Sequence, residues 1–187
     1  MRPALVVFAA VLTALADAGA QTSADWPQWR GPRRDGSIGA ELPAQWPEAL
    51  TKRWEIPVGA GHASPVVSGN RVVVFARQGD EEIVRALDLA SGKELWRAAY
   101  PAPYVVNPAA QSHGAGPKST PAISGGRVFT FGISGVLSAF DLASGKLLWR
   151  LPPPGVPPQY GSTTSPLVDG TSVIVHVGGE DYGALTS

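Results

Sequence analysis

The sequence predicts an all-β protein, a β-propeller built from four-stranded antiparallel blades, of which about two and a half are present. Three observations predict this fold. A motif recurs after 53 residues, at 86–97 and again at 139–150, and repeats of this period are typical of propellers, solenoids and arrays. The chain is turn-rich, with 22 glycines and 18 prolines, yet 44% of it is hydrophobic. No segment after the first twenty residues has helical periodicity.

Each repeat divides into four short strands joined by tight turns, which favours a propeller over a solenoid. A Ser-Pro or Thr-Pro step at 64–65, 120–121 and 165–166 precedes a short apolar strand. A glycine turn and a β-branched run then predict the second strand. The third strand leads into the repeated motif and the fourth leads out to its tryptophan. The third copy reaches Ser187 before its motif begins.

The motif reads Ala-x-Asp-x-x-Ser-Gly-Lys-x-x-Trp in both copies. Its aspartate can accept backbone N–H groups across a turn, and its glycine can adopt the positive φ of a bulged hairpin. A tryptophan on every fourth strand is suited to packing between neighbouring sheets. We therefore assign a structural docking role to Ala86, Asp88, Gly92, Trp96, Ala139, Asp141, Gly145 and Trp149. Residues 52–56 have the pattern of a further fourth strand, with no first three strands before them.

The N-terminus has the pattern of a secretory signal peptide over residues 1–20. A positive end is followed by an apolar run at 4–16 and by the small residues 18–20, so we expect cleavage after Ala20 and a periplasmic or extracellular protein. Thirteen residues are too few to span a bilayer. The predicted organisation then comprises a lead-in segment at 21–51 and a partial propeller at 52–187. Its repeats lie at about 59–100, 114–151 and 161–187.

Composition excludes several classes of function. The chain has no cysteine, so it has no disulfides, cysteine-ligated zinc, iron–sulfur clusters or thiol catalysis. Fifteen basic and fifteen acidic residues give a net charge of zero, which provides no electrostatic basis for nucleic-acid binding. The acidic runs 80–82 and 180–181 are typical of solvated hairpin tips rather than of a calcium site. We expect no metal site.

Polar residues precede the first strand of each repeat. If these strands line a channel, their side chains lie near one axial mouth, where loops from several blades converge. The candidate ligand contacts are His62, His113, Lys118, Ser119, Thr120 and Thr163. The alternative is that Ser or Thr before Pro only shapes an extended strand entry.

The repeated motif resembles the tryptophan-docking motif of quinoprotein (PQQ-like) β-propellers, with Ser in place of Thr. The opening segment 25–36 is similar to the start of secreted bacterial PQQ-like repeat proteins. The resemblance implies a ring of seven or eight blades. We therefore interpret the chain as an N-terminal fragment, with an open arc or an assembly of arcs as the alternatives. The family includes PQQ-dependent alcohol and glucose dehydrogenases, and also the propeller of the outer-membrane barrel assembly machinery, which binds no quinone.

Two functions remain open at this point. The favoured one is a secreted, non-catalytic binding or scaffold module for a protein or cell-envelope partner. The alternative is a PQQ-dependent dehydrogenase that oxidises an alcohol or sugar with the help of calcium, although no position matches the family's catalytic or calcium-binding motifs. A polysaccharide-binding module is a third, less favoured interpretation. Open blade edges also predict self-association.

Overall fold

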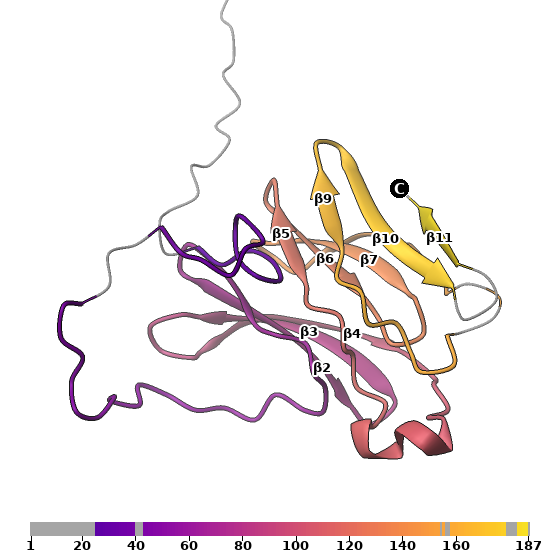
Figure 1. The fold of residues 1–187 in the computed structure, drawn as a ribbon, viewed down its shortest axis with the longest axis horizontal. Coiled ribbons are helices and arrows are strands. Elements are labelled where there is room, and N and C mark those ends of the chain that lie inside the picture. The colour runs from indigo at the N-terminus through magenta and orange to yellow at the C-terminus, as the bar shows by residue number, and fades with distance from the viewer. Residues whose placement is uncertain (1–24, 40–42, 154, 156–157, 179–182, 187) are drawn as a thin grey trace, which may run out of the picture.

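The structure is a computed structural model that describes residues 25–39, 43–153, 155, 158–178 and 183–186. Three antiparallel sheets follow one another along the chain, with strand orders β1-β2-β3-β4, β5-β6-β7-β8 and β11-β10-β9 (Figure 1). The predicted all-β fold of four-stranded antiparallel blades, present as a partial propeller, is confirmed. The predicted signal peptide and the acidic pair 180–181 lie outside the described residues.

Each sheet is called a blade. Blade 1 consists of β1 (Val66–Ser68), β2 (Arg71–Gln78), β3 (Glu81–Asp88) and β4 (Glu94–Pro101). Blade 2 consists of β5 (Ala122–Ser124), β6 (Arg127–Phe131), β7 (Leu137–Asp141) and β8 (Leu147–Leu151). Blade 3 consists of β9 (Leu167–Asp169), β10 (Ser172–Gly178) and β11 (Gly183–Thr186).

The connection between blades 1 and 2 contains a short 3-10 helix, η1 (Pro108–His113), which helical periodicity did not predict. It forms because the Asn107 side chain accepts a hydrogen bond from the backbone N–H of Ala109 at 2.9 Å, and because Pro108 needs no N–H partner in the first turn. In the described part of the chain, no helix has both the length and the apolar character needed to cross a lipid bilayer.

The two copies of the motif fold into the same turn. The Asp88 carboxylate accepts hydrogen bonds from the backbone N–H and hydroxyl of Ser91, at 2.9 and 2.6 Å. Asp141 accepts the equivalent bonds from Ser144, at 2.8 and 2.6 Å. These bonds, the serine hydroxyl's first, lower the pKa of both carboxyl groups. The two aspartates therefore hold turns and are not placed as bases.

The motif's alanine lies opposite its tryptophan on the neighbouring strand. Ala86 pairs with Trp96 between β3 and β4, and Ala139 pairs with Trp149 between β7 and β8. A small side chain beside the indole leaves space for the large ring.

Two tryptophans dock onto the turn of the next repeat. The indole N–H of Trp96 donates to the Leu142 carbonyl at 2.9 Å, and a Cβ on Gly145 would lie 2.5 Å from the Trp96 ring. Trp54 makes the same contacts with blade 1, donating to the Leu89 carbonyl at 2.9 Å. Only glycine therefore lets the indole approach the turn this closely.

The expected fourth strand at 52–56 is wrong as secondary structure, since these residues form no strand. Residues 25–39 and 43–51, the described part of the chain before them, contain no strand that could supply ladder hydrogen bonds. Trp54 docks on blade 1 nevertheless. The side chain therefore reproduces the repeat pattern although the backbone does not.

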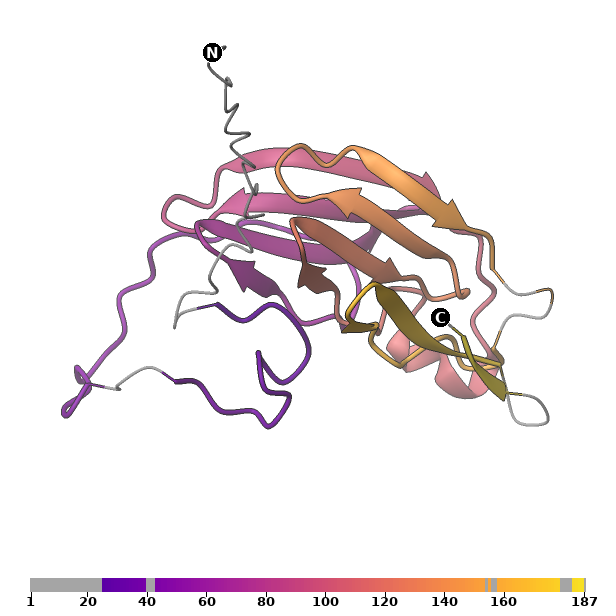
Figure 2. The same ribbon diagram turned by 90° about the horizontal axis from the view of Figure 1, so that it is seen from above.

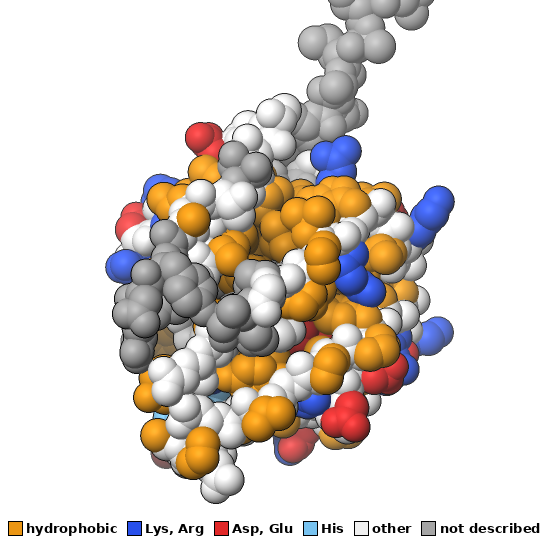
Figure 3. Space-filling view, turned by 90° about the vertical axis from the view of Figure 1, so that its right-hand side faces the viewer, with side chains coloured by type: hydrophobic (Ala, Val, Ile, Leu, Met, Phe, Trp, Pro, Cys, Tyr) orange, Lys and Arg blue, Asp and Glu red, His pale blue; other side chains and the backbone are white. Residues whose placement is uncertain are grey.

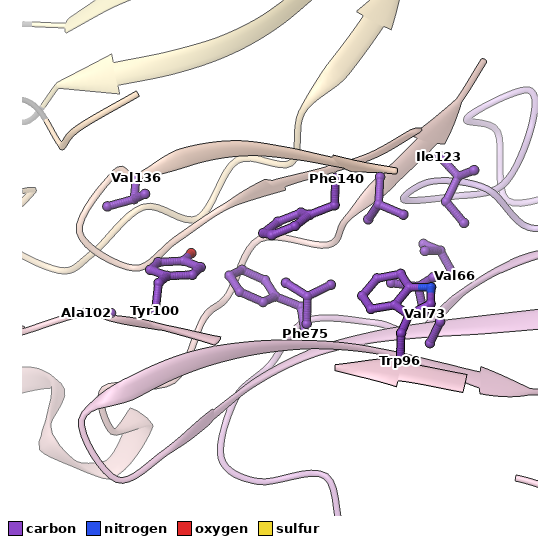
Figure 4. Packing of buried hydrophobic residues seen from close by; sticks show 12 residues of the cluster. Val66, Val73, Phe75, Trp96, Tyr100, Ala102, Ile123, Val136 and Phe140 are labelled. Atoms are coloured by element: carbon purple, nitrogen blue, oxygen red, sulfur yellow. The ribbon is translucent and has the colours of Figure 1, made fainter. Parts of the chain in front are cut away.

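The largest cluster of buried side chains lies between blades 1 and 2 (Figure 4). Phe75, Trp96 and Tyr100 of blade 1 point toward Ile123 and Phe140 of blade 2. Burial of these aromatic rings makes this interface the main source of hydrophobic stabilisation.

A smaller cluster, of Phe131, Leu137 and Val175, joins blades 2 and 3. The large hydrophobic side chains Leu147, Trp149 and Leu151 of β8 remain exposed. On the side of the molecule where β10 and β11 lie, hydrophobic side chains surround a hollow (Figure 3). Self-association through such surfaces stays a prediction.

The lead-in segment at 25–34, called the strap, forms hydrogen bonds with the first strand of every blade, reaching β9 through Arg34 and the Val168 carbonyl, and it runs beside β5 (Figure 1). Trp26 and Val67 of β1 exchange two backbone hydrogen bonds of 2.9 Å. The N–H of Ile123 donates to the Pro27 carbonyl at 2.7 Å. Figure 2 shows the strap on the same side of the sheets as the three first strands. The strap thus joins the three blades along their first strands.

Candidate functional site

A cavity of about 460 Å³ opens where the three first strands begin, and it is called the mouth cavity. Its walls come from the strap and from the segments that lead into β1, β5 and β9. The lining residues are Trp29, His62, Ser64, Lys118, Thr120, Thr163, Thr164 and Ser165. Four of the six predicted ligand contacts, His62, Lys118, Thr120 and Thr163, lie in this lining. That they contact a ligand stays a prediction.

Hydroxyl groups join the three blades around the mouth cavity. The Thr120 hydroxyl oxygen accepts the backbone N–H of Ser64 at 3.2 Å, and the Ser165 hydroxyl oxygen accepts the backbone N–H of Thr120 at 3.0 Å. Each hydroxyl retains its own hydrogen as a donor. The Ser and Thr residues before each proline therefore both shape the strand entry and present polar groups, so the two interpretations of these residues are compatible.

Backbone carbonyl groups hold the Lys118 and His62 side chains of the mouth cavity in place. The Lys118 ammonium donates to the Tyr160 carbonyl at 2.7 Å. His62 donates through Nε2 to the His113 carbonyl at 2.9 Å, and the two imidazole rings meet edge to face with centroids 5.8 Å apart. His113 therefore supports His62 from outside the lining.

Ser119 lies below the surface rather than in the mouth cavity. It is fully buried, and its hydroxyl has no hydrogen-bond partner among the described residues. Alternation along the strand entry explains this position, because the neighbours Lys118 and Thr120 line the cavity and the residue between them faces inward.

Trp29 lines the cavity, although the sequence analysis assigned it no role in the site. The strap brings it to the mouth cavity, and 54% of its surface stays exposed. The Arg30 guanidinium lies 5.5 Å from the centre of its ring. Its place in the opening motif was visible in the sequence, but no local pattern shows which blade the strap will contact.

Described residues of the mouth cavity do not fit a quinone cofactor with calcium. The lining contains one ammonium and no carboxylate, whereas PQQ carries three carboxylates and calcium takes six to eight oxygen ligands. No group of three or more His, Asp or Glu side chains within the described ranges is arranged to hold a metal ion. We derive no chemical step through either group.

A second buried polar cluster surrounds Glu82, between blades 1 and 2. Its carboxylate accepts the Ile133 backbone N–H and the Tyr100 hydroxyl, both at 2.6 Å. Glu82 is fully buried, and burial raises its pKa and that of Tyr100. A Cβ on Gly132 would collide with this carboxylate.

The expectation that residues 80–82 form a solvated hairpin tip is therefore wrong for Glu82, although Asp80 and Glu81 are exposed. Strand alternation turns Glu82 toward blade 2, where the Ile133 N–H donates to it, and the Tyr100 hydroxyl of its own blade is the second donor. Both carboxylate oxygens are used within the interface, so we assign Glu82 a structural role.

The fold, the docking turns and the repeat define a propeller-type repeat protein. A family model described as "Outer membrane protein assembly factor BamB", with PQQ-like repeats, matches residues 47–106 and 79–186. The two matches together span about three quarters of the sequence. The chain belongs to this family, and the resemblance to PQQ-like propellers is confirmed. No curated protein matches.

Several solved structures are similar to the chain. A europium-containing methanol dehydrogenase has a TM-score of 0.44 and 24% identity, over 67% of this chain and 22% of that one. Quinohemoprotein alcohol dehydrogenase from Comamonas testosteroni gives 0.44 and 25%, over 63% and 17%. BamB from Moraxella catarrhalis gives 0.39 and 21%, over 63% and 30%. The chain thus spans less than a third of each of these proteins.

Proposed function

We propose that this protein is a non-catalytic binding module of the cell envelope, whose partner engages the mouth cavity. One observation carries the proposal. Side chains from the strap and all three blades converge on a single cavity whose described lining has hydroxyls, an imidazole and an ammonium but no carboxylate. Such a lining is suited to recognition by hydrogen bonding. It offers no carboxylate for a base or a calcium ligand.

The predicted signal peptide and the family description support an envelope location. The partner is a protein or another envelope component. The proposed contacts are His62, Lys118, Thr120 and Thr163, with Trp29 added by the structure.

Co-sedimentation with an isolated cell-envelope fraction tests the proposal. The purified protein is expected to sediment with the fraction, and the double variant Lys118→Ala/Thr163→Ala is expected to lose at least tenfold in affinity. Lys146→Ala is the matched control, because it removes an exposed lysine in the docking turn and outside the cavity.

The competing function is tested on the same preparation. The protein is titrated with PQQ and calcium while quinone fluorescence and dye reduction are followed with an alcohol or sugar present. Micromolar PQQ binding with turnover would overturn the proposal. Equal sedimentation of the cavity variant and its control would overturn the assignment of the partner to the mouth cavity.

A further inference from the structure

We propose that the mouth cavity binds an acidic saccharide, one whose sugar ring carries a single carboxylate. Trp29 is the stacking surface and Lys118 is the partner of the carboxylate. This inference rests on the proposed binding function and names its ligand class. It follows from three features of the cavity: an aromatic side chain on an anchored turn, a set of hydroxyl groups and one available ammonium group.

The aromatic side chain is held in place by the strap. Trp29 lies in a turn in which the N–H of Gly31 donates to the Gln28 carbonyl at 3.0 Å. Arg34 holds the Gln28 side chain with two hydrogen bonds, of 3.0 and 2.9 Å. Gly31 has a φ of 78°, and a Cβ there would lie 2.7 Å from the Trp26 ring. The turn that presents the indole is therefore held in place before a ligand binds, which reduces the entropy cost of binding.

An exposed indole at the edge of a polar cavity is suited to a sugar ring. A pyranose has one face of C–H groups that can pack on an aromatic ring and a rim of hydroxyl groups that need hydrogen-bond partners. Trp29 offers the aromatic surface, while Thr163 and Thr164 are exposed in the segment that leads into β9. These hydroxyls can each donate and accept, which matches the dual character of sugar hydroxyls.

The charge of the cavity selects for one carboxylate. Lys118 uses one of its three ammonium hydrogens on the Tyr160 carbonyl, so two donors remain for a ligand. A neutral sugar would leave this cation without an anionic partner, whereas the single carboxylate of the sugar ring that enters the cavity would pair with it. The volume of about 460 Å³ is within the range of small-molecule sites, about 300 to 1,000 Å³.

Isothermal titration calorimetry of the full chain with two trisaccharides tests the inference. Trigalacturonate carries a carboxylate on every ring, and maltotriose is its neutral counterpart. We expect trigalacturonate to bind at least tenfold more tightly at low salt. The preference should fall as salt rises, because an exposed ion pair is screened.

Two variants separate the contributions of Trp29 and Lys118 to saccharide binding. Trp29→Ala is expected to weaken both ligands at least tenfold, whereas Trp46→Ala, which removes another exposed tryptophan (62% exposed), should change neither. Lys118→Gln keeps a donor for the Tyr160 carbonyl and should abolish the preference for the acidic ligand. Unchanged thermal unfolding of Trp29→Ala will show that the protein is folded, since that side chain is largely exposed.

The outcomes separate this inference from the proposed function. Absence of saccharide binding, with envelope binding retained, overturns the ligand class and leaves the binding module standing. Equal affinity for the two trisaccharides overturns the role of Lys118. PQQ binding with turnover overturns the proposed function itself.

Discussion

The interface between blades 1 and 2 and the interface between blades 2 and 3 contain the same motif, but its tryptophan is packed differently in each. Trp96 of blade 1 is 8% exposed, whereas Trp149 of blade 2 is 37% exposed. Both tryptophans lie opposite an alanine, and both follow the same Asp-Ser-Gly turn. Local structure is therefore equal at the two sites, and burial is not.

The difference arises in the neighbouring repeat. Trp96 docks on Gly145 and on the Leu142 carbonyl of blade 2. Among the described residues Trp149 has no such turn to dock on, and its ring lies near Phe129 of its own blade, with ring centroids 6.1 Å apart. A docking tryptophan is buried by the glycine turn that follows it, so its contribution depends on a residue about fifty positions away.

The largest expected effect comes from truncating the two tryptophans. Trp96→Ala should lower the free energy of unfolding by about 3 to 5 kcal/mol, because it opens a cavity in the core. Trp149→Ala should cost about 1 to 2 kcal/mol, since much of its ring remains in water. Urea denaturation of both variants measures the difference. Equal losses would show that the two interfaces are equally packed.

Glycine substitution tests the same contact from the other side. Gly145→Ala places a methyl group 2.5 Å from the Trp96 ring at a φ of 72°, and should cost about 3 kcal/mol through overpacking and backbone strain. Gly125→Ala is the control, because it has a φ of 54° and no atom within 4 Å of the added carbon. Strain alone should cost about 1 kcal/mol there. If thermal unfolding gives equal shifts, close contact with the indole is not what requires glycine.

Glu82 should make the first interface sensitive to pH. Burial raises its pKa above the ordinary 4.5, and this effect exceeds the opposing effects of its hydrogen bonds and of Arg77 and Arg150. Between the unfolded and the folded pKa the native state binds more protons, so the free energy of unfolding should fall as pH rises above about 4.5.

Glu82→Gln should remove this slope while keeping a carbonyl for the Ile133 N–H. The measurement is the difference in unfolding free energy between the variant and the wild type, followed upward from pH 4. Asp35, Asp88 and Asp141 have lowered pKa values, so their contributions lie at more acidic pH. A difference that does not vary with pH would show that Glu82 is not the responsible group.

The smallest effect is expected in the docking turns. Lys93→Ala and Lys146→Ala remove exposed side chains at equivalent positions and should each change the free energy of unfolding by less than about 0.5 kcal/mol. A larger loss in either copy, measured by urea denaturation, would mean that the lysine contributes to docking in that blade.

Much of the candidate site could be predicted from the sequence. The proline steps marked where each first strand begins, and the polar residues before them, including His62 and Lys118, line one cavity. Trp29 could not be assigned in this way, because its place depends on hydrogen bonds between the strap and strands that lie up to 134 residues away. Glu82 was misinterpreted for a related reason, since its two partners include the Ile133 N–H of another blade.

The sequence by itself determined the strands of the three blades, the docking turns and the repeat, because turn hydrogen bonds and strand alternation depend on neighbours a few residues apart. Only the tertiary structure decided which tryptophan is buried, where the strap runs and which carboxylate is buried. Those outcomes depend on desolvation and contact between segments distant in the chain, and identical motifs acquire different environments when the neighbouring blade differs.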